Sequence, residues 1–466
     1  MALRGKHILR APSFWIVLFF AVRLIGITNP PLEGGHSWRQ VTGLMVARNF
    51  LEVDANILLP RVDTNGGKDQ IIGMEFPLLN YLHYLLSLLF GYTHWYGRLI
   101  NLSITSLGIF HFSRLISKVF NERTGLYTAL ALIFSIFFSY SRKMMPDTFS
   151  VAFALMTLHF AYQYLREKKR AALGYFMFCA LIALLSKVTS GLVLSALLLF
   201  SFDRKLDRRK WLELCGGFIL ILVPVYYWYF VWNPELATEY GRWYNQGMSW
   251  KEGWQEISSN LSAAAKRFYF YAFYAFSGCL LTIWAVVCAI REKHKPLLGL
   301  MLIYSIFGSL YMVKSGFFFH HHNYYVIPFT PFLALLVAYG LTKIKKSWLS
   351  ISLICVLGLE SVANQQHDFF IKEEVKYKMQ LEALMDGIST KDEKIVVLGA
   401  GNPQLIYLSH RKGWLRSEAQ LHDNADTDRL RKAGATFLVI DKNAGESVDW
   451  AGKLILDGQD FRIYRF

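Results

Sequence analysis

Long apolar runs alternate with short polar segments along most of this chain. Each run approaches or reaches the ~20 residues that a helix needs to cross the hydrocarbon core of a bilayer. The runs are residues 13–29, 77–113 (in two pieces), 125–140, 148–165, 173–186, 188–202, 212–231, 268–290, 297–313, 325–342 and 349–363. This pattern predicts a mainly α-helical, polytopic transmembrane bundle.

Basic residues gather in six short segments between these runs. Lys and Arg in short loops mark the cytoplasmic side of a membrane protein. The segments are 1–11, 113–124, 166–172, 203–211, 291–296 and 343–346. They account for most of the net charge of +16, so we expect membrane lipids and no nucleic acid as partners.

The alternation of charge predicts about 11–12 crossings and an extracytoplasmic tail. It requires 77–113 to cross only once, with 77–91 as a juxtamembrane or partly inserted helix. Arg23 interrupts the first run and no small-residue cleavage pattern follows it, so we predict an uncleaved first helix. The five cysteines lie in or beside apolar runs, which gives neither a disulfide framework nor zinc-type spacing.

The composition changes at about residue 364, which predicts two domains. Residues 1–363 form the transmembrane domain, with a first external loop over 30–76, and 364–466 form a small extracytoplasmic α/β domain. In that tail we predict strands over 394–400 and 436–442, a helix over 426–434 and a hairpin over 454–466. The "GAGNP" that follows the first strand lacks the third glycine of a dinucleotide-binding loop.

The first external loop concentrates side chains that carry chemistry. Glu33 and Glu75 lie close to the ends of apolar helices, where packing can fix a carboxylate. The loop also holds cationic, imidazole and aromatic side chains, namely His36, Trp38, Arg39 and Arg48. Glu33 and His36 are candidates as base or metal ligand, the two arginines as phosphate contacts, and Trp38 as a platform for a sugar or an interfacial anchor.

Two further parts of this loop suggest less specific roles. Residues 41–52 have apolar positions at helical spacing, which predicts an amphipathic helix lying on the membrane. Asp63 and Asp69 stand in the glycine-rich "VDTNGGKDQ", which predicts mobile and solvated side chains.

Three other external segments carry polar groups. In "SRKMMPDTF", Asp147 is either a helix cap or, with Arg142, part of a phosphate-facing patch. Lys187, in "LSKVTSG", lies outside against the positive-inside trend, so it is a candidate counter-charge for an anion. The segment "GFFFHHHNYYVIPFTP" (316–331) offers three histidines, which point different ways, or an aromatic belt.

In their order, these motifs resemble the GT-C superfamily of membrane glycosyltransferases. The resemblance is closest to the branch with protein O-mannosyltransferases and the lipid A aminoarabinose transferase, and spans roughly residues 10–365. The matching pieces are "HSWRQ…ARNF" (36–50), "EFPLLNYL" (75–82), "GRLINLSITSLGIF" (97–110), "SRKMMPD" (141–147), "LSKVTSG" (185–191) and "HHHNYYVIPFTPFLALL" (320–336).

The resemblance implies transfer of a sugar from a polyprenyl-phosphate carrier on the extracytoplasmic face. Asp147 matches the acid of the family's second external loop, and Lys187 matches a lysine that follows. His322 and Tyr324 lie in its His-Tyr-Tyr-Pro region. The family's early Asp-Glu pair is missing, because "HSWRQVT" occupies that place, so Glu33 and Glu75 are the nearest substitutes.

The chemistry of such a donor predicts how the site is assembled. A carboxylate deprotonates the acceptor, and cations or a divalent metal stabilise the leaving phosphate. We therefore expect Glu33, Glu75 and Asp147 to converge just outside the membrane, with His36 and His322 as candidate metal ligands. The acceptor is a lipid, a glycan or a protein, and the expected location is the bacterial inner membrane with a periplasmic site.

Two other functions share these features. A transporter or flippase of lipid-linked sugars would also need an apolar groove and cations, but its internal repeats are not evident here. A polysaccharide polymerase or ligase would use the long loop 232–267 for its acceptor.

Overall fold

The computed structural model describes residues 8–64, 66, 68–203, 206–241, 247–445 and 448–466. The chain divides into two compact units. Unit 1 consists of residues 1–27, 97–231 and 245–367, and unit 2 of residues 28–96, 232–244 and 368–466.

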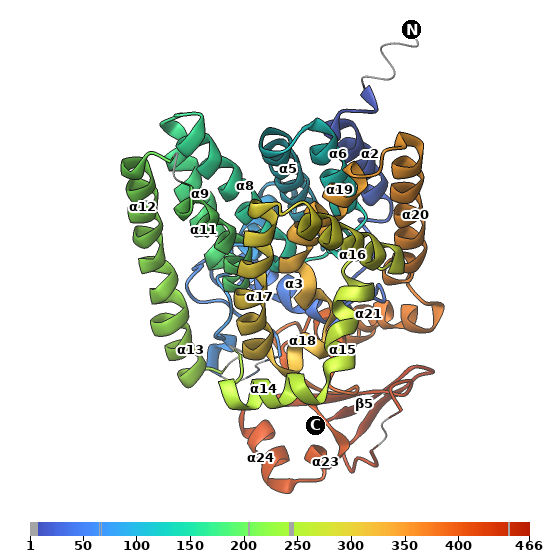
Figure 1. The fold of residues 1–466 in the computed structure, drawn as a ribbon. Helices are drawn as coiled ribbons and strands as arrows, with labels where there is room; N and C mark the ends of the chain where they lie inside the picture. The colour runs from blue at the N-terminus through green and yellow to red at the C-terminus, as the bar shows by residue number, and fades with distance from the viewer. Residues whose placement is uncertain (1–7, 65, 67, 204–205, 242–246, 446–447) are drawn as a thin grey trace. The chain divides into compact units, whose positions relative to one another are not determined.

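Unit 1 is a bundle of helices (Figure 1). The helices are α2 (Pro12–Leu24), α5 (Tyr96–Val119), α6 (Glu122–Ile133), α7 (Ile136–Tyr140), α8 (Pro146–Arg166), α9 (Ala171–Ser186), α10 (Gly191–Leu194), α11 (Leu198–Ser201), α12 (Arg208–Tyr226), α14 (Trp250–Ser259), α15 (Leu261–Lys266), α16 (Phe276–Arg291), α17 (Lys295–Ser315), α18 (Phe317–His321), α19 (Thr330–Thr342) and α20 (Ser347–Gln365). The predicted mainly α-helical bundle is confirmed.

Several helices are long and apolar enough to cross a membrane. Among the described residues there are five, and a sixth if a pair bent by 91° forms one span. They are Tyr96–Val119, Arg208–Glu239, Lys295–Ser315, Asn323–Thr342 and Ser347–Asp386, with the pair Leu261–Tyr271 and Phe276–Arg291. Shorter apolar helices cover Pro12–Leu24, Leu78–Phe90, Ala171–Ser186 and Val188–Ser201. The number of crossings therefore stays a prediction.

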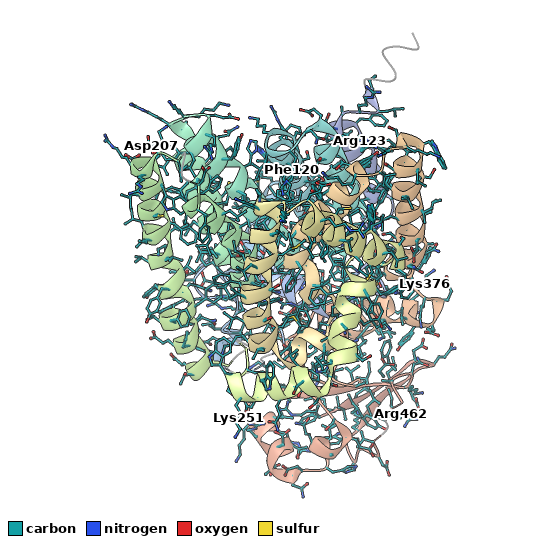
Figure 2. All side chains as sticks on the ribbon, viewed as in Figure 1. Phe120, Arg123, Asp207, Lys251, Lys376 and Arg462 are labelled. Carbon is teal, nitrogen blue, oxygen red and sulfur yellow. The ribbon has the colours of Figure 1, made fainter. Side chains whose placement is uncertain are left out.

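Residues from predicted cytoplasmic segments and from a predicted external loop lie toward different ends of unit 1. Figure 2 shows Phe120, Arg123 and Asp207, from predicted cytoplasmic segments, toward one end of the unit. Lys251, from the predicted external loop 232–267, lies toward the other end. The basic segments 113–124 and 203–211 therefore lie toward the same end of unit 1, and the loop with Lys251 lies toward the opposite end.

Unit 2 combines the first external loop with the tail. Its helices and strands are α3 (Ser37–Glu52), α4 (Leu78–Phe90), α13 (Asn233–Glu239), α21 (Leu381–Asp386), β1 (Lys394–Leu398), α22 (Gln404–Ser409), β2 (Gly413–Arg416), α23 (Glu418–Leu421), α24 (Asn424–Lys432), β3 (Ala435–Asp441), β4 (Leu454–Asp457) and β5 (Phe461–Arg465). At 13 residues, or about 20 Å, α4 is too short for a bilayer core of about 30 Å. This length agrees with a single crossing over 77–113.

The tail builds a five-stranded sheet in the order β2-β1-β3-β5-β4. β1 runs parallel to β2 and β3, whereas β5 pairs antiparallel with β3 and β4. The predicted strands, helix and terminal hairpin are therefore all present. The amide of Gly413 in β2 donates to Asp63 O at 2.8 Å, and the amide of Gly66 donates to Gly413 O at 3.0 Å. Main-chain bonds thus attach the first external loop to the edge strand of the sheet.

The helix predicted over 41–52 is present as α3, but its predicted place on a membrane surface is wrong. Ten of its residues, from Gln40 to Phe50, are buried, and they cover all faces of the helix. α3 packs against α4 on one side and against α22 of the tail on another. Its polar residues face protein partners, which is why the helix needs no exposed polar face.

Candidate active site

An ion pair joins the start of α8 to the end of α9 in unit 1. Asp147 lies in the first turn of α8, directly after Pro146. Lys187 follows the last residue of α9, where an extended backbone (φ −164°, ψ 116°) ends the helix. Its Nζ donates to Asp147 Oδ1. Because α8 and α9 are neighbours joined through 167–170, the pair lies at their ends remote from that basic connection.

The pair is largely buried and has unused hydrogen-bonding capacity. The side chain of Lys187 is 17% exposed and that of Asp147 is 6% exposed. Asp147 Oδ2 is buried and accepts no hydrogen bond from the described residues. An ammonium carries three N–H donors, of which Asp147 takes one. The pair therefore offers N–H donors and a free carboxylate oxygen at one point.

Aromatic rings cover the lysine. Lys187 Nζ lies 5.4 Å from the ring centroid of Tyr324 and 5.7 Å from that of Tyr325, both within cation–π range. Both tyrosines belong to the 3-10 segment Asn323–Phe329, which directly follows His322. Tyr324 of the matched His-Tyr-Tyr-Pro region therefore lies beside Lys187 of the matched lysine motif.

Asn101 fixes the loop that leads into α8. From α5, its Nδ2 donates to Lys143 O at 2.9 Å and to Met145 O at 3.1 Å. Its Oδ1 accepts from Thr148 Oγ1 at 3.0 Å. The amide thereby holds the residues on both sides of Asp147. The sequence interpretation missed Asn101, although a carboxamide inside an apolar run is a recognisable signal of function.

Arg142 has a structural role. Its Nη1 donates to Ile25 O at 2.6 Å and its Nη2 to Gly26 O at 3.0 Å, just beyond the end of α2. Arg98 Nη1 donates to the next carbonyl, Ile27 O, at 3.1 Å. Two arginines thus hold the segment that leads out of the first helix. The predicted contact of Arg142 with a phosphate stays a prediction.

The three consecutive histidines have separate partners. His320 Nε2 lies 2.7 Å from Glu256 Oε1, and the ring of His321 stacks on a phenylalanine at 4.7 Å. The ring of His322 stacks on Tyr324, with centroids 5.2 Å apart. His322 therefore belongs to the aromatic group beside Lys187, and the ring of His321 adjoins it at 4.8 Å, whereas His320 faces Glu256.

In unit 2, Glu33 is fully buried near the start of the first external loop. Asn29 Nδ2 donates to its Oε1 at 3.4 Å, and the next residue, Gly34, donates its amide to Phe370 O at 3.2 Å. His36 then adopts a left-handed conformation (φ 54°) and begins α3. The start of the tail thus fixes the loop around Glu33.

Glu75 forms an ion pair with Arg39 of α3. The glutamate is 5% exposed, and its Oε2 is buried without a hydrogen-bond partner among the described residues. Trp38, the neighbour of Arg39, is about half exposed, which suits a platform for a sugar or an interfacial anchor. Unit 2 therefore presents a second carboxylate that is held by a cation through one oxygen.

Arg48 forms a structural ion pair, and the predicted mobility of Asp63 is wrong. Arg48 Nη2 lies 2.7 Å from Asp63 Oδ2, and both side chains are more than 90% buried. Asn49 Nδ2 donates to Asp63 Oδ1 at 2.7 Å. Arg48 also donates to Tyr407 O at 3.2 Å and lies 4.6 Å from that ring centroid. These partners explain why a glycine-rich loop still has a buried aspartate.

A second ionic cluster follows at the end of α3. Glu52 Oε1 and Glu382 Oε1 each lie 2.9 Å from a ring nitrogen of His410. Burial raises the pKa of Glu52, but the hydrogen bond from His410 and the charge of Arg48 outweigh it, so the pKa lies below its ordinary value. The ionised carboxylate is therefore the form that links α3 to the tail.

The divalent metal ion considered from the sequence stays a prediction. No group of three or more His, Cys, Asp or Glu side chains among the described residues is arranged to hold one. His36 and His322, the two candidate ligands, belong to different units. We derive no reaction step through a metal.

One protein-family model matches part of the chain. The model of the family of dolichyl-phosphate-mannose-protein mannosyltransferases matches residues 75–228. This range contains Glu75, Asn101, Asp147 and Lys187. No curated protein matches the chain by sequence.

Solved structures share the fold over nearly the whole chain. ArnT from Cupriavidus metallidurans in the apo state has a TM-score of 0.65 at 16% identity, covering 97% of both chains. The same protein bound to undecaprenyl phosphate has a TM-score of 0.63 at 15% identity, covering 97% of this chain and 98% of that one. The oligosaccharyltransferase AglB from Archaeoglobus fulgidus has a TM-score of 0.57 at 11% identity, covering 92% of this chain and 69% of that one.

These matches show the GT-C fold. The family model adds a sequence match over 75–228, the part of the chain that holds the ion pair of Asp147 and Lys187. The predicted GT-C fold is therefore confirmed.

The predicted site residues fall into two groups. In unit 1, Asp147, Lys187, His322 and Tyr324 gather at one place. In unit 2, Glu33, His36, Arg39 and Glu75 cluster around the first loop and α3, whereas Arg48 is committed to Asp63. The expected convergence of the three candidate acids involves both units and stays a prediction.

Proposed function

We propose that this chain transfers a sugar from a polyprenyl-phosphate donor to a lipid, glycan or protein acceptor on the extracytoplasmic face of the membrane. The match of residues 75–228 to the model of the dolichyl-phosphate-mannose-protein mannosyltransferases supports a sugar transfer. ArnT was solved with undecaprenyl phosphate and AglB with dolichol phosphate and an inhibitory peptide, which supports a polyprenyl-linked donor. In a bacterial inner membrane, this face is the periplasmic side.

The ion pair of Asp147 and Lys187 is the observation that carries the proposal. A polyprenyl phosphate presents its phosphate at the membrane interface. The pair lies at the ends of α8 and α9 that are opposite the basic segment 166–172. Lys187 has N–H donors beyond the one that Asp147 accepts. We infer that these donors bind the phosphate, while Asp147 and the two tyrosines keep the ammonium in place.

The chemical step needs a cation and a proton acceptor. The acceptor hydroxyl attacks the anomeric carbon, and the bond from that carbon to the phosphate oxygen breaks. The bonding electrons leave with the phosphate, whose growing charge Lys187 stabilises. The hydroxyl proton passes to a carboxylate oxygen. Asp147 Oδ2 is buried beside the lysine without a partner among the described residues, so it is well placed to receive it.

Two other carboxylates remain candidates for the base. Glu75 Oε2, like Asp147 Oδ2, is buried without a hydrogen-bond partner among the described residues, and the other oxygen of Glu75 is paired with Arg39. Glu33 is buried in the same loop. Which of the three accepts the proton is open to experiment.

Turnover by the protein in lipid nanodiscs, with a polyprenyl-phosphate sugar, tests the proposal. The variants Glu33→Gln, Glu75→Gln and Asp147→Asn keep the side-chain shape and remove the charge. At least one should lower turnover by about 100-fold, the usual loss when general-base help is removed. Asp69→Asn is the matched control, because Asp69 is an exposed acid of the same loop. Near-normal turnover of all three variants would place the active site elsewhere.

A further inference from the structure

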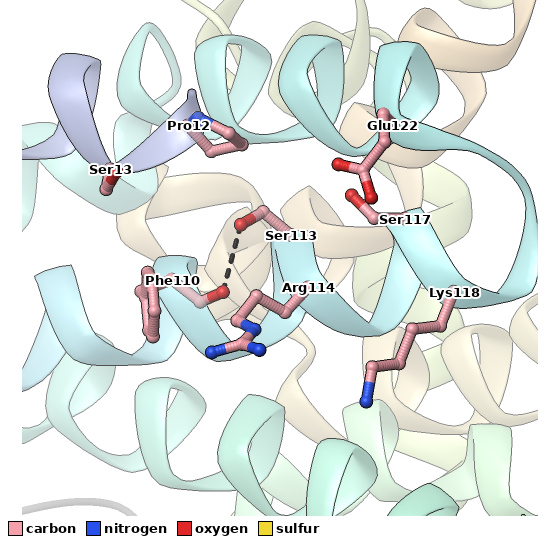
Figure 3. Close-up of a pocket in the computed structure, with 8 residues that line it drawn as sticks. All are labelled: Pro12, Ser13, Phe110, Ser113, Arg114, Ser117, Lys118 and Glu122. Carbon is pink, nitrogen blue, oxygen red and sulfur yellow. Dashed lines mark hydrogen bonds between the residues drawn. The ribbon is translucent and has the colours of Figure 1, made fainter. Parts of the chain in front are cut away.

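A cavity of about 310 Å³ lies in unit 1 between α2, α5 and the start of α6 (Figure 3). Its walls are lined by Pro12, Ser13, Phe110, Ser113, Arg114, Ser117, Lys118 and Glu122. From Asn101 to Arg114 is thirteen residues of α5, or about 20 Å along the helix. The cavity is therefore separate from the place where Asp147 and Lys187 meet.

Close packing of α5 on α6 shapes the floor of this cavity. A Cβ atom on Gly125 would lie 2.0 Å from Ser117 Oγ and 2.8 Å from Ser113 O, so only glycine allows the approach. Ser113 Oγ turns back to donate to Phe110 O at 2.9 Å. Ser117 and Glu122 face one another at one side of the cavity (Figure 3). The close approach of Gly125 thus fixes Ser113 and Ser117, two polar residues that line the cavity.

Two opposite charges at the cavity have no ionic partner in the described part of the chain. Arg114 lies 5.5 Å from the ring centroid of Phe110 and forms no hydrogen bond or ion pair with a described residue. Glu122 likewise forms no ion pair with a described residue. Lys118 differs, because it is paired with Glu167. The cavity therefore offers one cation and one anion to a ligand.

The surroundings indicate a ligand that is partly in the membrane. Leu107 and Phe110 precede Arg114 by seven and four residues, so all three lie on one face of α5, and Leu107 is about half exposed. Arg114 stands in the segment 113–124, whose basic residues predict the cytoplasmic interface. An apolar stripe thus leads to a charged cavity at the depth of lipid headgroups.

We propose that this cavity binds the headgroup of a zwitterionic phospholipid of the phosphatidylethanolamine type. Arg114 binds the phosphate, since a guanidinium matches phosphate oxygens through two parallel hydrogen bonds. The start of α2, at Pro12 and Ser13, has no side-chain cap and adds the positive end of a helix dipole. Glu122 binds the ammonium, and the acyl chains follow the stripe of Leu107 and Phe110.

Native mass spectrometry of the detergent-purified full chain, titrated with defined lipids, tests this site. The wild type should bind phosphatidylethanolamine more tightly than phosphatidylglycerol, which lacks the ammonium. Arg114→Gln should weaken both by about tenfold, the size of one charge-assisted hydrogen bond. Glu122→Gln should remove the preference between them and leave the N-cap of α6 intact, because Asn121 provides that cap. Arg209→Gln, an exposed arginine that does not line the cavity, should bind as wild type.

Two results would overturn the proposal. One is equal binding of phosphatidylethanolamine by the wild type, Arg114→Gln and Glu122→Gln in protein that elutes as wild type from a sizing column. The other is displacement of the lipid by the same concentration of soluble O-phosphoethanolamine, which would assign the cavity to a free phosphate compound. Both readouts are independent of sugar transfer.

Discussion

Breaking the ion pair between Arg48 and Asp63 should destabilise unit 2 strongly. Both side chains are more than 90% buried, and the Nη2 and Oδ2 atoms are 2.7 Å apart. Asp63→Asn keeps the shape of the side chain but leaves the guanidinium buried without its counter-charge. Removing one member of such a pair costs about 3–5 kcal/mol.

The contacts that remain place the expected loss near the lower limit. Arg48 keeps its hydrogen bond to Tyr407 O at 3.2 Å and its place over that ring. A loss of about 3 kcal/mol corresponds to a fall in Tm of roughly 6–12 °C for a unit of this size. The double variant Arg48→Met with Asp63→Leu should lose less than Asp63→Asn, because apolar side chains of similar volume leave no unpaired charge.

Tryptophan fluorescence on heating, in detergent, measures these shifts. The matched control is Asp54→Asn, which breaks a 3.0 Å pair with Arg61 in the same loop. The side chain of Asp54 is 41% exposed, so this control should cost less than about 1 kcal/mol. Equal Tm values for Asp63→Asn and Asp54→Asn would refute the structural role of Arg48. A double variant that is stable but no longer binds the donor would also refute it, because this result would favour the predicted contact of Arg48 with a phosphate.

Three other predictions follow from single contacts. Asn101→Ala should lower both Tm and turnover, because the loop before Asp147 loses its anchor. The buried carbonyls left without a donor should reduce the free energy of unfolding by about 1–3 kcal/mol. Unchanged Tm and turnover would contradict this. Arg142→Lys should reduce thermal stability, since a point charge cannot serve the carbonyls at 25 and 26 as a guanidinium does, yet leave donor affinity intact if the role is structural. Because the pKa of Glu52 is lowered in the folded state, the stability it contributes is present above its ordinary pKa of 4.5 and is lost as the pH falls through the folded value. The Glu52→Gln variant lacks this titration. The stability difference between the wild type and this variant, followed by fluorescence, should therefore be largest at pH 7 and shrink as the pH falls to 3. A difference that is the same at pH 7 and at pH 3 would contradict the linkage.

The sequence predicts the helical bundle and the tail because both depend on local patterns. Apolar runs specify helices, and the short apolar segments 394–400 and 436–442 become β1 and β3. The edge strand β2 was not predicted, because its four residues "GWLR" show no alternation. Its pairing with the main chain near Asp63 depends on a segment some 350 residues away, which no local pattern reveals.

The site was only partly predictable for a similar reason. A lysine against the charge trend indicated Lys187, and an acid at a helix start indicated Asp147, but their pairing joins residues 40 apart in the chain. Arg48 looked like a phosphate contact because its partner, Asp63, stands in a loop with the composition of a solvated turn. The polar side of α3 is covered by the tail, so a helix that reads as amphipathic is buried on all faces.

Affinity for the donor lipid measures the central claim most directly. We expect Lys187→Met, in lipid nanodiscs, to bind polyprenyl phosphate at least about tenfold more weakly than the wild type, because a charge-assisted contact is lost. Lys314→Met is the control, since Lys314 is another cation of unit 1 that bonds to Met248 O and does not contact Asp147. The account predicts a wild-type dissociation constant for Lys314→Met and a raised one for Lys187→Met. Equal dissociation constants for Lys187→Met and the wild type would contradict it.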